Sequence, residues 1–338
     1  MEKVSITITC YNEASYLPQA IESALSQDYP NLEVVVSDNA SEDDTREVVG
    51  PFLGDSRVFY FRNETNLGFV RNYRRALYEH ATGDYVLHLD GDDFLTDSRY
   101  IGDAMDLIRR HGLVMVFARA RTFFENRNQY VEDKVNRNLP EVMDGNWLFL
   151  NYFKGYSIPL LTVVHDRRQA MKIGFYNKEG LLSSDWESAL RLMLGRRVGF
   201  KNRFVGVWRR HGSNLSQTRE LGILLSNTAY IESPYQFALK ARCFPRPVLD
   251  KWRLRMLKRY FVSLLMRFTI LRDETSRGRV LDHVKRHYGD VYRSLLRDPR
   301  YLGLRIVSKH RGMLVFLFRE ILKQESFLRD LEGIRDAP

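Results

Sequence analysis

Short apolar runs alternate with helix-like patterns through the first 120 residues. Runs rich in β-branched residues predict strands, and the segment after each run has apolar positions at helical spacing. The predicted strands are residues 4–9, 33–37, 57–61 and 85–89, and the predicted helices are residues 16–25, 43–52 and 69–80. Strands and helices that alternate in this order favour an α/β fold with a mostly parallel central sheet.

The pattern changes further along the chain. Residues 113–210 are mixed, with strands predicted over 113–118, 160–165 and 203–208 and a helix over 184–194. From about residue 221 the pattern is helical only, with helices predicted over 250–268, 279–296 and 313–331. The first of these has one apolar stripe, which suits a protein core or a membrane surface equally: Leu254, Leu257, Phe261, Leu264, Leu265 and Phe268. We expect an α/β domain over residues 1–220 and an all-helical domain over residues 221–338.

Charge is unevenly distributed between these two predicted domains. The chain has a net charge of +10. Residues 1–220 contain 28 Lys and Arg against 30 Asp and Glu, whereas residues 221–338 contain 24 against 12. A basic helical segment of this kind either binds an anionic partner, such as a membrane surface, or simply presents a solvated face. The sequence leaves both interpretations open.

The cysteines and the hydropathy pattern indicate in which cellular compartment the protein is found. Cys10 and Cys243 lie far apart without the spacing of metal ligands, which favours a reducing environment. The first apolar run is too short for a signal peptide, and no run approaches the ~20 apolar residues of a spanning helix. We therefore expect a cytoplasmic protein, either soluble or peripheral on the inner face of the membrane.

Polar residues follow three of the predicted strands. They are Tyr11-Asn12-Glu13, Asp38-Asn39 and Asp90-Gly91-Asp92-Asp93. The carboxyl ends of parallel strands meet at one edge of a sheet, and ligands of such folds bind at that edge. These side chains are therefore expected to converge on one site.

The most informative of these clusters is the acidic one. Asp90, Asp92 and Asp93 place three carboxylates within four residues, and these groups repel one another unless a cation joins them. Mg²⁺ commonly takes one or two carboxylates together with substrate phosphates. The motif therefore predicts a metal that holds a diphosphate. The alternative is an acidic turn before the next helix, which Asp97 or Ser98 can cap unaided.

Asp38 and Arg71 are candidates for contacts with a nucleotide. Asp38 follows a buried strand and can accept an N–H of a pyrimidine base, while Ser41 and Asp43 suit the cap of the next helix. Arg71 opens a helix after a glycine turn, where it either reaches a phosphate or is solvated.

Two further candidates lie in the mixed region. Asp185 opens a helix and is a candidate general base for an acceptor hydroxyl, with Glu187 as its competitor, or else a helix cap. His211 is a candidate metal ligand through its neutral imidazole, although a single histidine after a strand commonly has a structural role. Arg209 or Arg210 can neutralise a leaving diphosphate.

Together these residues resemble the family 2 glycosyltransferases of the GT-A fold. The resemblance is specific over residues 3–95, weaker to about residue 217 and absent beyond. It rests on Tyr11-Asn12-Glu13 after the first strand, on Ser37-Asp38-Asn39-Ala40-Ser41 with Asp44-Thr45, on Asn66, Gly68, Arg71 and Asn72, and on Leu89-Asp90-Gly91-Asp92-Asp93. The chain departs from the family at Ser184, where Glu is usual, at Thr9-Cys10, where Pro is common, and at Asn39, where a second Asp is common.

The resemblance implies a role for each candidate. The residues that would bind the donor nucleotide are Thr9, Tyr11, Glu13, Asp38, Arg71, Asp90 and Asp92. Of these, Asp38 would contact the base. Asp92, Asp93 and His211 would hold the metal, which is implied to be Mn²⁺ or Mg²⁺, and Asp185 would be the catalytic base.

The implied activity is inverting transfer of a sugar from a nucleotide diphosphate donor, first a UDP-sugar and second a dTDP-sugar, to an acceptor hydroxyl. The acceptor would be a saccharide or a lipid-linked saccharide in the assembly of a surface polysaccharide or glycolipid, and a homo-oligomer is one role for the helical segment. A nucleotidyltransferase is disfavoured because residues 9–15 contain no Gly or Lys. A nucleic-acid-binding protein is disfavoured because the basic segment lacks a recognisable fingerprint. A non-catalytic scaffold of the same fold is disfavoured by the retained carboxylates.

Overall fold

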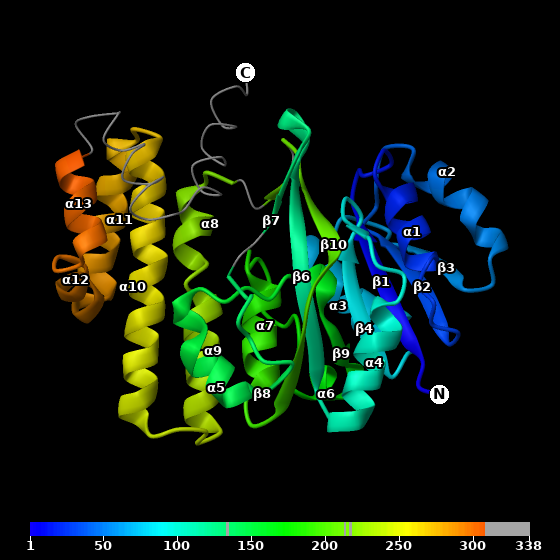
Figure 1. The fold of residues 1–338 in the computed structure, drawn as a ribbon. Coiled ribbons are helices and arrows are strands. Elements are labelled where there is room, and N and C mark those ends of the chain that lie inside the picture. The colour runs from blue at the N-terminus through cyan, green and yellow to red at the C-terminus, as the bar shows by residue number, and fades with distance from the viewer. Residues whose placement is uncertain (133–134, 213, 216–217, 308–338) are drawn as a thin grey trace. The chain divides into compact units, whose positions relative to one another are not determined.

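The computed structural model describes residues 1–132, 135–212, 214–215 and 218–307 (Figure 1). Its contacts divide the chain into two compact units. The first contains Met1–His211 and Gln236–Cys243, and the second contains Gly212–Tyr235 and the chain from Phe244 onward. The division into domains at residue 220 stays a prediction. The helix predicted over residues 313–331 lies outside the described residues.

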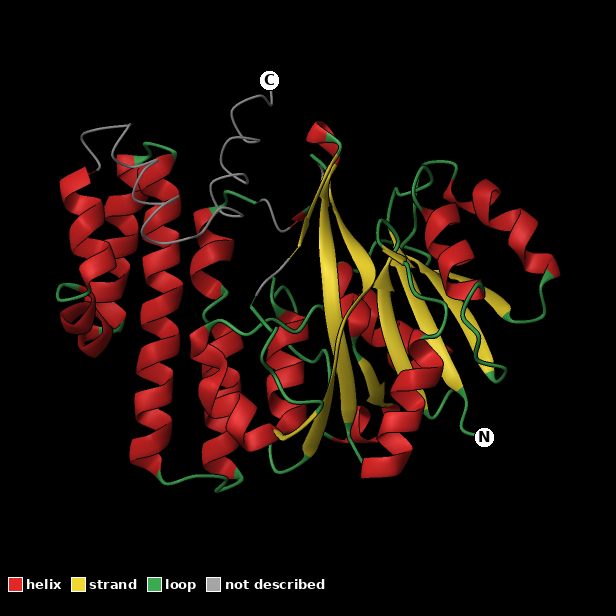
Figure 2. Cartoon of the chain, viewed as in Figure 1, coloured by secondary structure: helices red, strands yellow, loops and turns green. Residues whose placement is uncertain are grey.

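The first unit is built on a ten-stranded sheet (Figure 2). Its strands are β1 (Val4–Cys10), β2 (Leu32–Asp38), β3 (Val58–Arg62), β4 (Tyr85–Asp90), β5 (Phe94–Leu95), β6 (Met115–Phe124), β7 (Gln129–Glu132), β8 (Val142–Asp144), β9 (Val164–Asp166) and β10 (Arg197–Arg210). The order is β3-β2-β1-β4-β9-β6-β10-β5, with β7 beside β6 and β8 beside β10. Strands β3, β2, β1 and β4 are parallel, and so are β6 and β10, whereas the short strands pair antiparallel. The expected α/β architecture is confirmed.

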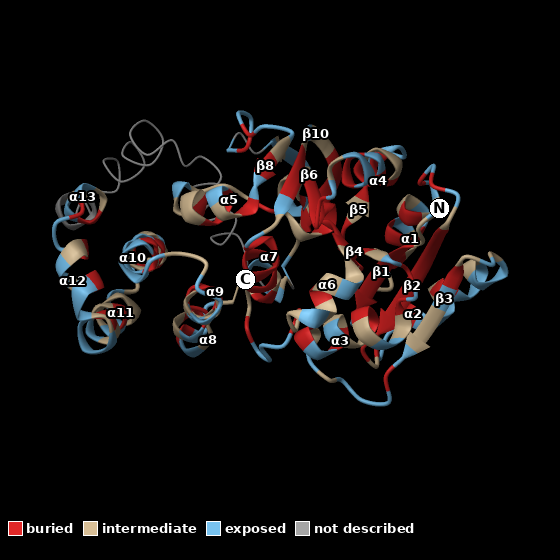
Figure 3. Cartoon of the chain, turned by 90° about the horizontal axis from the view of Figure 1, so that it is seen from below, coloured by how far each residue is buried: buried red, intermediate tan, exposed pale blue. Residues whose placement is uncertain are grey.

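The described part of the chain before β10 contains seven α-helices. They are α1 (Leu17–Leu25), α2 (Thr45–Val49), α3 (Phe69–Arg75), α4 (Tyr100–His111), α5 (Gly145–Asn151), α6 (Arg167–Lys172) and α7 (Ser184–Met193). A π-helical turn, Ala76–His80, extends α3. Helices α1 and α4 lie on one face of the sheet, and α3 and α6 lie on the other (Figure 3).

Strand β1 shows why the parallel half of the sheet forms. All seven of its residues are buried, because β2 and β4 pair with its two edges and helices cover both faces of the sheet. A strand that is covered on both faces requires an uninterrupted run of apolar or small residues, and residues 4–10 supply one. The helix that follows, α1, buries Leu17, Ala20, Ile21 and Ala24 at helical spacing against this core.

Two of the later predictions need correction. The strand predicted over residues 160–165 is only Val164–Asp166, because a 3₁₀ turn, Leu160–Thr162, follows Pro159. The strand predicted over residues 203–208 is the end of the much longer β10, which begins at Arg197. Its pairing with β6 shifts register between Lys201 and Gly206, and this irregularity interrupts the alternation that marks a strand in sequence.

The second unit is helical, as predicted. It contains α8 (Leu221–Ser226), the start of α9 (Ala229–Lys240), α10 (Arg246–Ile270), α11 (Glu274–His287), α12 (Gly289–Leu295) and α13 (Pro299–Val307). The helix predicted over residues 279–296 is two helices, because Tyr288 leaves helical geometry at φ −139° and ψ 61° before Gly289.

The apolar stripe of α10 lies in a protein core. Leu257, Phe261, Leu264, Leu265 and Phe268 are at most 5% exposed. Burial of these side chains favours the core interpretation of the stripe over the membrane interpretation. Within the part of the chain that is described, no helix is both long and apolar enough to cross a bilayer. Both cysteines are unpaired.

Candidate active site

The carboxyl ends of β1, β2 and β4 form one edge, and the loops that leave them are joined by hydrogen bonds. The Asn39 amide donates to Cys10 O at 2.9 Å, and the Gly91 amide donates to Thr9 O at 2.9 Å. Asn12 adopts a left-handed backbone at φ 57°, and its own amide donates to Ser41 Oγ at 3.0 Å. The three polar clusters that the sequence predicted at strand ends therefore do converge.

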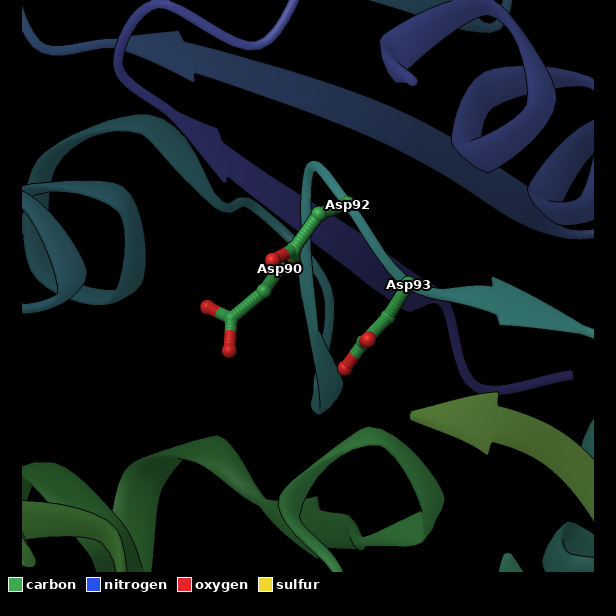
Figure 4. Close-up of side chains that lie close together, drawn as sticks. All are labelled: Asp90, Asp92 and Asp93. Atoms are coloured by element: carbon green, nitrogen blue, oxygen red, sulfur yellow. The ribbon is translucent and has the colours of Figure 1, made fainter. Parts of the chain in front are cut away.

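The three aspartates leave the turn between β4 and β5 toward the same side (Figure 4). Asp90, Asp92 and Asp93 each offer a carboxylate oxygen, and these oxygens all lie within 4.8 Å of one another. Asp92 and Asp93 are 8% and 3% exposed. Three carboxylates at this separation form a suitable oxygen ligand set for a hard divalent cation.

Each aspartate is also fixed by a neighbour. Tyr73 on α3 donates its O–H to Asp90 Oδ1 at 2.7 Å. The backbone amide of Arg209 on β10 donates to Asp93 Oδ1 at 2.8 Å. His211 Nε2 lies 2.8 Å from Asp92 Oδ2. Residues from α3, from β10 and from the segment just after β10 therefore hold the turn in place, as the outer partners of metal ligands do.

The electrostatics of this cluster favour a bound cation. Burial, and then the charges of Asp92 and Asp90, hold the pKa of Asp93 well above its usual range. Burial and the same two charges also raise the pKa of Glu13, whose Oε2 atom is buried and finds no hydrogen-bond partner in the described part of the chain. Four buried or half-buried carboxyl groups cannot all ionise at neutral pH unless positive charge joins them. The donor set and the unpartnered oxygen thus fit a divalent metal.

Gly91 allows the turn to pack tightly against the end of β1. A Cβ atom at this position would lie 2.3 Å from Glu13 Oε2 and 3.0 Å from Cys10 Cβ. The motif therefore needs glycine for close approach, which brings Glu13 beside the aspartates.

The end of β10 closes one side of the site. The His211 ring stacks on Tyr16 with centroids 4.8 Å apart. The Arg209 side chain is 9% exposed, and its Nε donates to Asp92 O at 2.9 Å. Arg209 thus supports the backbone of the acidic turn, whereas Arg210 lies over the rings of Trp208 and Phe124. Metal ligation by His211 stays a prediction, since its Nε2 faces Asp92.

Asp38 is fully buried and holds the loop after β2. Its Oδ1 accepts from the Ser41 amide at 2.8 Å, and its Oδ2 accepts from the Tyr60 hydroxyl at 2.6 Å. Arg62 Nε lies 3.3 Å from the same Oδ2 atom. Ser41 does not cap α2, because its hydroxyl accepts from Asn12 instead. The geometry gives Asp38 a structural role, and its contact with a nucleotide base stays a prediction.

The other proposed donor-binding residues lie around this edge in different environments. The Thr9 side chain lies against His88, with Oγ1 3.2 Å from Nε2. Tyr11, at the end of β1, is 39% exposed. Arg71 pairs with Glu179 on the surface at 2.6 Å, and both side chains are more than half exposed. An exposed ion pair of this kind contributes little to stability, so Arg71 can exchange its partner for a phosphate.

Asp185 lies in the first turn of α7 and is half-buried. Burial is the main cause that raises its pKa to about 7, and the negative charge of Asp90 adds to the effect. The backbone amide of Trp186 acts in the opposite direction. A carboxyl group whose pKa lies near neutrality is well matched to general-base catalysis.

Glu187, the competitor for that role, is part of the core. It is fully buried, and its carboxylate accepts from Arg191 Nε at 2.7 Å and Arg191 Nη2 at 2.8 Å. Arg191 also donates to the carbonyls of Ile173 and Gly174. This ion pair anchors the loop before α7, so the structure favours Asp185 over Glu187 as the base.

Sequence reasoning missed the residues beneath the aspartates. His88 on β4 lies 3.1 Å from Thr7 Oγ1 and 3.4 Å from Asp90 Oδ1. Its ring packs edge-on against Tyr73 at 4.2 Å. The one available signal was spacing, because His88 and Asp90 are two residues apart and so share a face of β4.

The site can now be compared with known proteins. Residues 5–175 match the model of a family described as "Glycosyl transferase family 2". The chain belongs to this family. Residues 5–175 therefore form a glycosyltransferase domain of family 2.

Among its relatives is the Escherichia coli UDP-Glc:alpha-D-GlcNAc-diphosphoundecaprenol beta-1,3-glucosyltransferase WfaP, which is 30% identical over 180 residues. The match covers 52% of this chain and 65% of that enzyme, which is less than two thirds of its length. The similarity between the two proteins thus extends over only part of each chain.

Solved structures show the same fold over almost the whole chain. Staphylococcus aureus TarS 1-349 in complex with UDP-GlcNAc has a TM-score of 0.70 at 19% identity, covering 94% of this chain and 92% of that one. The mannosyltransferase PcManGT from Pyrobaculum calidifontis, in complex with GDP-Man and Mn²⁺, has a TM-score of 0.52 at 18% identity, covering 93% and 85%. The GT-A fold with a helical extension, which the sequence predicted, is confirmed.

Proposed function

We propose that this glycosyltransferase moves a sugar from a UDP-sugar to an acceptor hydroxyl with inversion at the anomeric carbon. The observation that carries the proposal is the cluster of Asp90, Asp92 and Asp93 beside Glu13, whose Oε2 has no hydrogen-bond partner among the described residues, together with Asp185, whose pKa responds to the Asp90 charge. One carboxyl group poised as a base thus lies near a set of carboxylates suited to a metal and a diphosphate.

Asp92 and Asp93 are proposed as the protein ligands of a divalent metal, with Asp90 supporting them and His211 closing the site. Mn²⁺ is the first candidate, since a structure of the same fold contains it, and Mg²⁺ is the second. A cation at this position offsets the negative charge of a departing diphosphate. Asp38, Glu13, Tyr11 and the backbone of Thr9 would line the nucleotide pocket. We prefer uracil because a structure of the same fold binds UDP-GlcNAc.

Asp185 would act on the acceptor. Its carboxylate would take the proton of the acceptor hydroxyl as the oxygen attacks the anomeric carbon. The bond from that carbon to the donor diphosphate breaks as the new glycosidic bond forms, so the centre inverts. The partly buried position of Asp185 keeps its pKa near that of a useful base, and only its ionised form can accept the proton.

Turnover should therefore rise with pH. Below the pKa of Asp185, kcat is expected to increase about tenfold per pH unit, and above it to level off. Saturating Mn²⁺ offsets the charge of Asp90, so the midpoint is expected below the metal-free value of about 7. The measurement is UDP release from UDP-Glc and from UDP-GlcNAc between about pH 5 and about pH 9, with water taking the sugar in place of the acceptor hydroxyl. A rate that falls as pH rises through this range would contradict the assignment of a carboxylate base.

The acceptor is proposed to be a saccharide, free or linked to a lipid diphosphate, in the assembly of a surface glycan. The E. coli relative is named for a diphosphoundecaprenol-linked acceptor. Helices α10, α11 and α12 carry exposed basic side chains that could face an anionic membrane: Arg246, Lys251, Arg255, Lys285, Arg286 and Arg293. A peripheral position at the inner membrane surface would bring such an acceptor to the enzyme.

This membrane association predicts salt-sensitive binding of the full chain to vesicles. Co-sedimentation is expected with phosphatidylglycerol vesicles at about 50 mM salt and is expected to be largely lost at about 500 mM, because exposed charges are screened. Phosphatidylcholine vesicles serve as the control and should not bind. If the protein fails to sediment with anionic vesicles at low salt, the basic helices serve a different purpose, such as solubility or a homo-oligomer.

A further inference from the structure

Tyr176 has a backbone conformation that bulky residues rarely adopt. It lies in the loop between α6 and α7 at φ +58°, in the left-handed region. Two residues of α7 hold this loop: the Tyr176 amide donates to Ser188 Oγ at 3.0 Å, and Arg191 donates to Gly174 O at 2.9 Å. Strained backbone of this kind persists where the surroundings enforce it, and it is found disproportionately at functional sites.

The Tyr176 side chain points beneath the site. It is 2% exposed, and its ring packs against Tyr73 at 5.3 Å and His88 at 5.8 Å. These are the two residues that contact Asp90. The Tyr176 ring thus belongs to the aromatic cluster that supports the acidic turn.

The hydroxyl of Tyr176 has no hydrogen-bond partner among the described residues, although it is buried. Other buried tyrosines are satisfied: the Tyr73 hydroxyl donates to Asp90, and the fully buried Tyr100 hydroxyl donates to Thr162 O. A buried hydroxyl without a partner is unfavourable, and a phenylalanine would avoid the problem. The hydroxyl is therefore expected to gain a partner during function.

The charges around this hydroxyl indicate which partner. Burial raises the pKa of Tyr176, and the negative charges of Asp185 and then Asp90 raise it further. Asp90 already accepts a hydrogen bond from Tyr73. The donors found for the Asp185 carboxyl are backbone amides at the start of α7. Within the described part of the chain, Asp185 is therefore the one of these two carboxyl groups that has backbone donors only.

We propose that Tyr176 is a positioning residue for the base, and that its phenol O–H donates a hydrogen bond to the Asp185 carboxylate during sugar transfer. This proposal rests on the role of Asp185 in the proposed function. The hydrogen bond would hold one carboxylate oxygen, so that the other faces the acceptor hydroxyl. The fold brings the Tyr176 loop to this part of α7, because the Tyr176 amide donates to Ser188 Oγ and Ser188 lies about one helical turn beyond Asp185.

The test is Tyr176→Phe, which removes only the hydroxyl. We expect kcat for UDP release from UDP-Glc or UDP-GlcNAc to fall about 10–100-fold, as for the loss of one hydrogen bond to a charged group. KM for the donor and the affinity for UDP should stay within about twofold. Tm should be unchanged or higher, because no hydrogen bond is lost in the substrate-free protein. Tyr176→Met, which also lacks the hydroxyl, should show the same loss of kcat.

Tyr100→Phe is the matched control. Its hydroxyl is buried and partnered, so the variant should lose stability and keep the wild-type kcat. In an Asp185→Asn background, Tyr176→Phe should cause no further loss, since Tyr176 acts through Asp185. A wild-type kcat in Tyr176→Phe would overturn the proposal, and so would a raised KM with unchanged kcat. If Asp185→Asn itself keeps full activity, the proposed base is wrong, which is a different failure.

Discussion

Asp185→Asn is expected to lower kcat by about 10²–10⁴-fold, the usual contribution of a general base. The amide cannot take the proton of the acceptor hydroxyl, although it keeps the shape of the side chain. UDP affinity should stay within about twofold, because the nucleotide pocket lies at the ends of β1, β2 and β4. Tm at neutral pH should not fall, because the raised pKa of Asp185 means that its ionised form is disfavoured in the folded protein. Steady-state turnover, UDP titration and thermal unfolding measure the three effects.

Glu187→Gln is the matched control on the same helix. Glu187 is fully buried in an ion pair with Arg191, so neutralising it leaves a buried guanidinium without a counter-ion. Breaking a buried pair of this kind costs about 3–5 kcal/mol. The expected contrast is a stable, slow enzyme for Asp185→Asn and an unstable one for Glu187→Gln. A stable Glu187→Gln variant with greatly reduced kcat, beside an active Asp185→Asn variant, would assign the base to Glu187.

Asp93→Asn is expected to abolish metal-dependent activity and to stabilise the metal-free protein. The raised pKa of Asp93 means that the native state binds its proton more tightly than the unfolded chain does. This contribution to stability is present at low pH and is lost as pH rises toward the folded pKa. Removing the charge should therefore raise Tm in EDTA by about 1–4 °C near pH 8. The asparagine keeps an oxygen for the Arg209 amide.

The same variant should respond differently to metal. Mn²⁺ is expected to raise the Tm of the wild type, because a ligand that binds only the native state stabilises it, and to leave Asp93→Asn nearly unchanged. Asp44→Asn is the control, since Asp44 is exposed on the loop after β2 and makes no side-chain cap bond to α2. An equal Mn²⁺ shift in wild type and Asp93→Asn would remove Asp93 from the ligand set.

The parallel half of the fold could be predicted because its signals are local. β1, β2 and β4 are short runs of apolar or β-branched residues that the sheet buries almost completely, so each was found to within about one residue. The mixed half could not be predicted as well. The register shift in β10 and the turn after Pro159 depend on pairing with β6 and β4, and no local pattern encodes such partners.

The residues of the site also differ in whether a local sequence signal predicts them. Asp90, Asp92 and Asp93 could be found because three acids after a buried strand are unusual in themselves. Tyr73 and His88 lie in an apparently ordinary helix and strand, and only the fold brings their polar atoms to Asp90. The sequence favoured Asp185 over Glu187 through the family resemblance alone, since the physical difference between them depends on where Arg191 lies. Tyr176 gave no local signal, because its left-handed backbone is set by α7.

The most direct test of a metal-dependent UDP-sugar site is calorimetric titration of the wild-type chain with UDP, dTDP and GDP, each in Mn²⁺ and in EDTA. The account predicts that UDP binds in Mn²⁺, that EDTA abolishes or greatly weakens this binding, and that Asp93→Asn behaves in Mn²⁺ as the wild type does in EDTA. Binding of dTDP alone would support the proposed nucleotide site but would identify the donor as a dTDP-sugar instead of a UDP-sugar. Failure of all three nucleotides to bind in Mn²⁺, or equal binding in EDTA, would contradict the account.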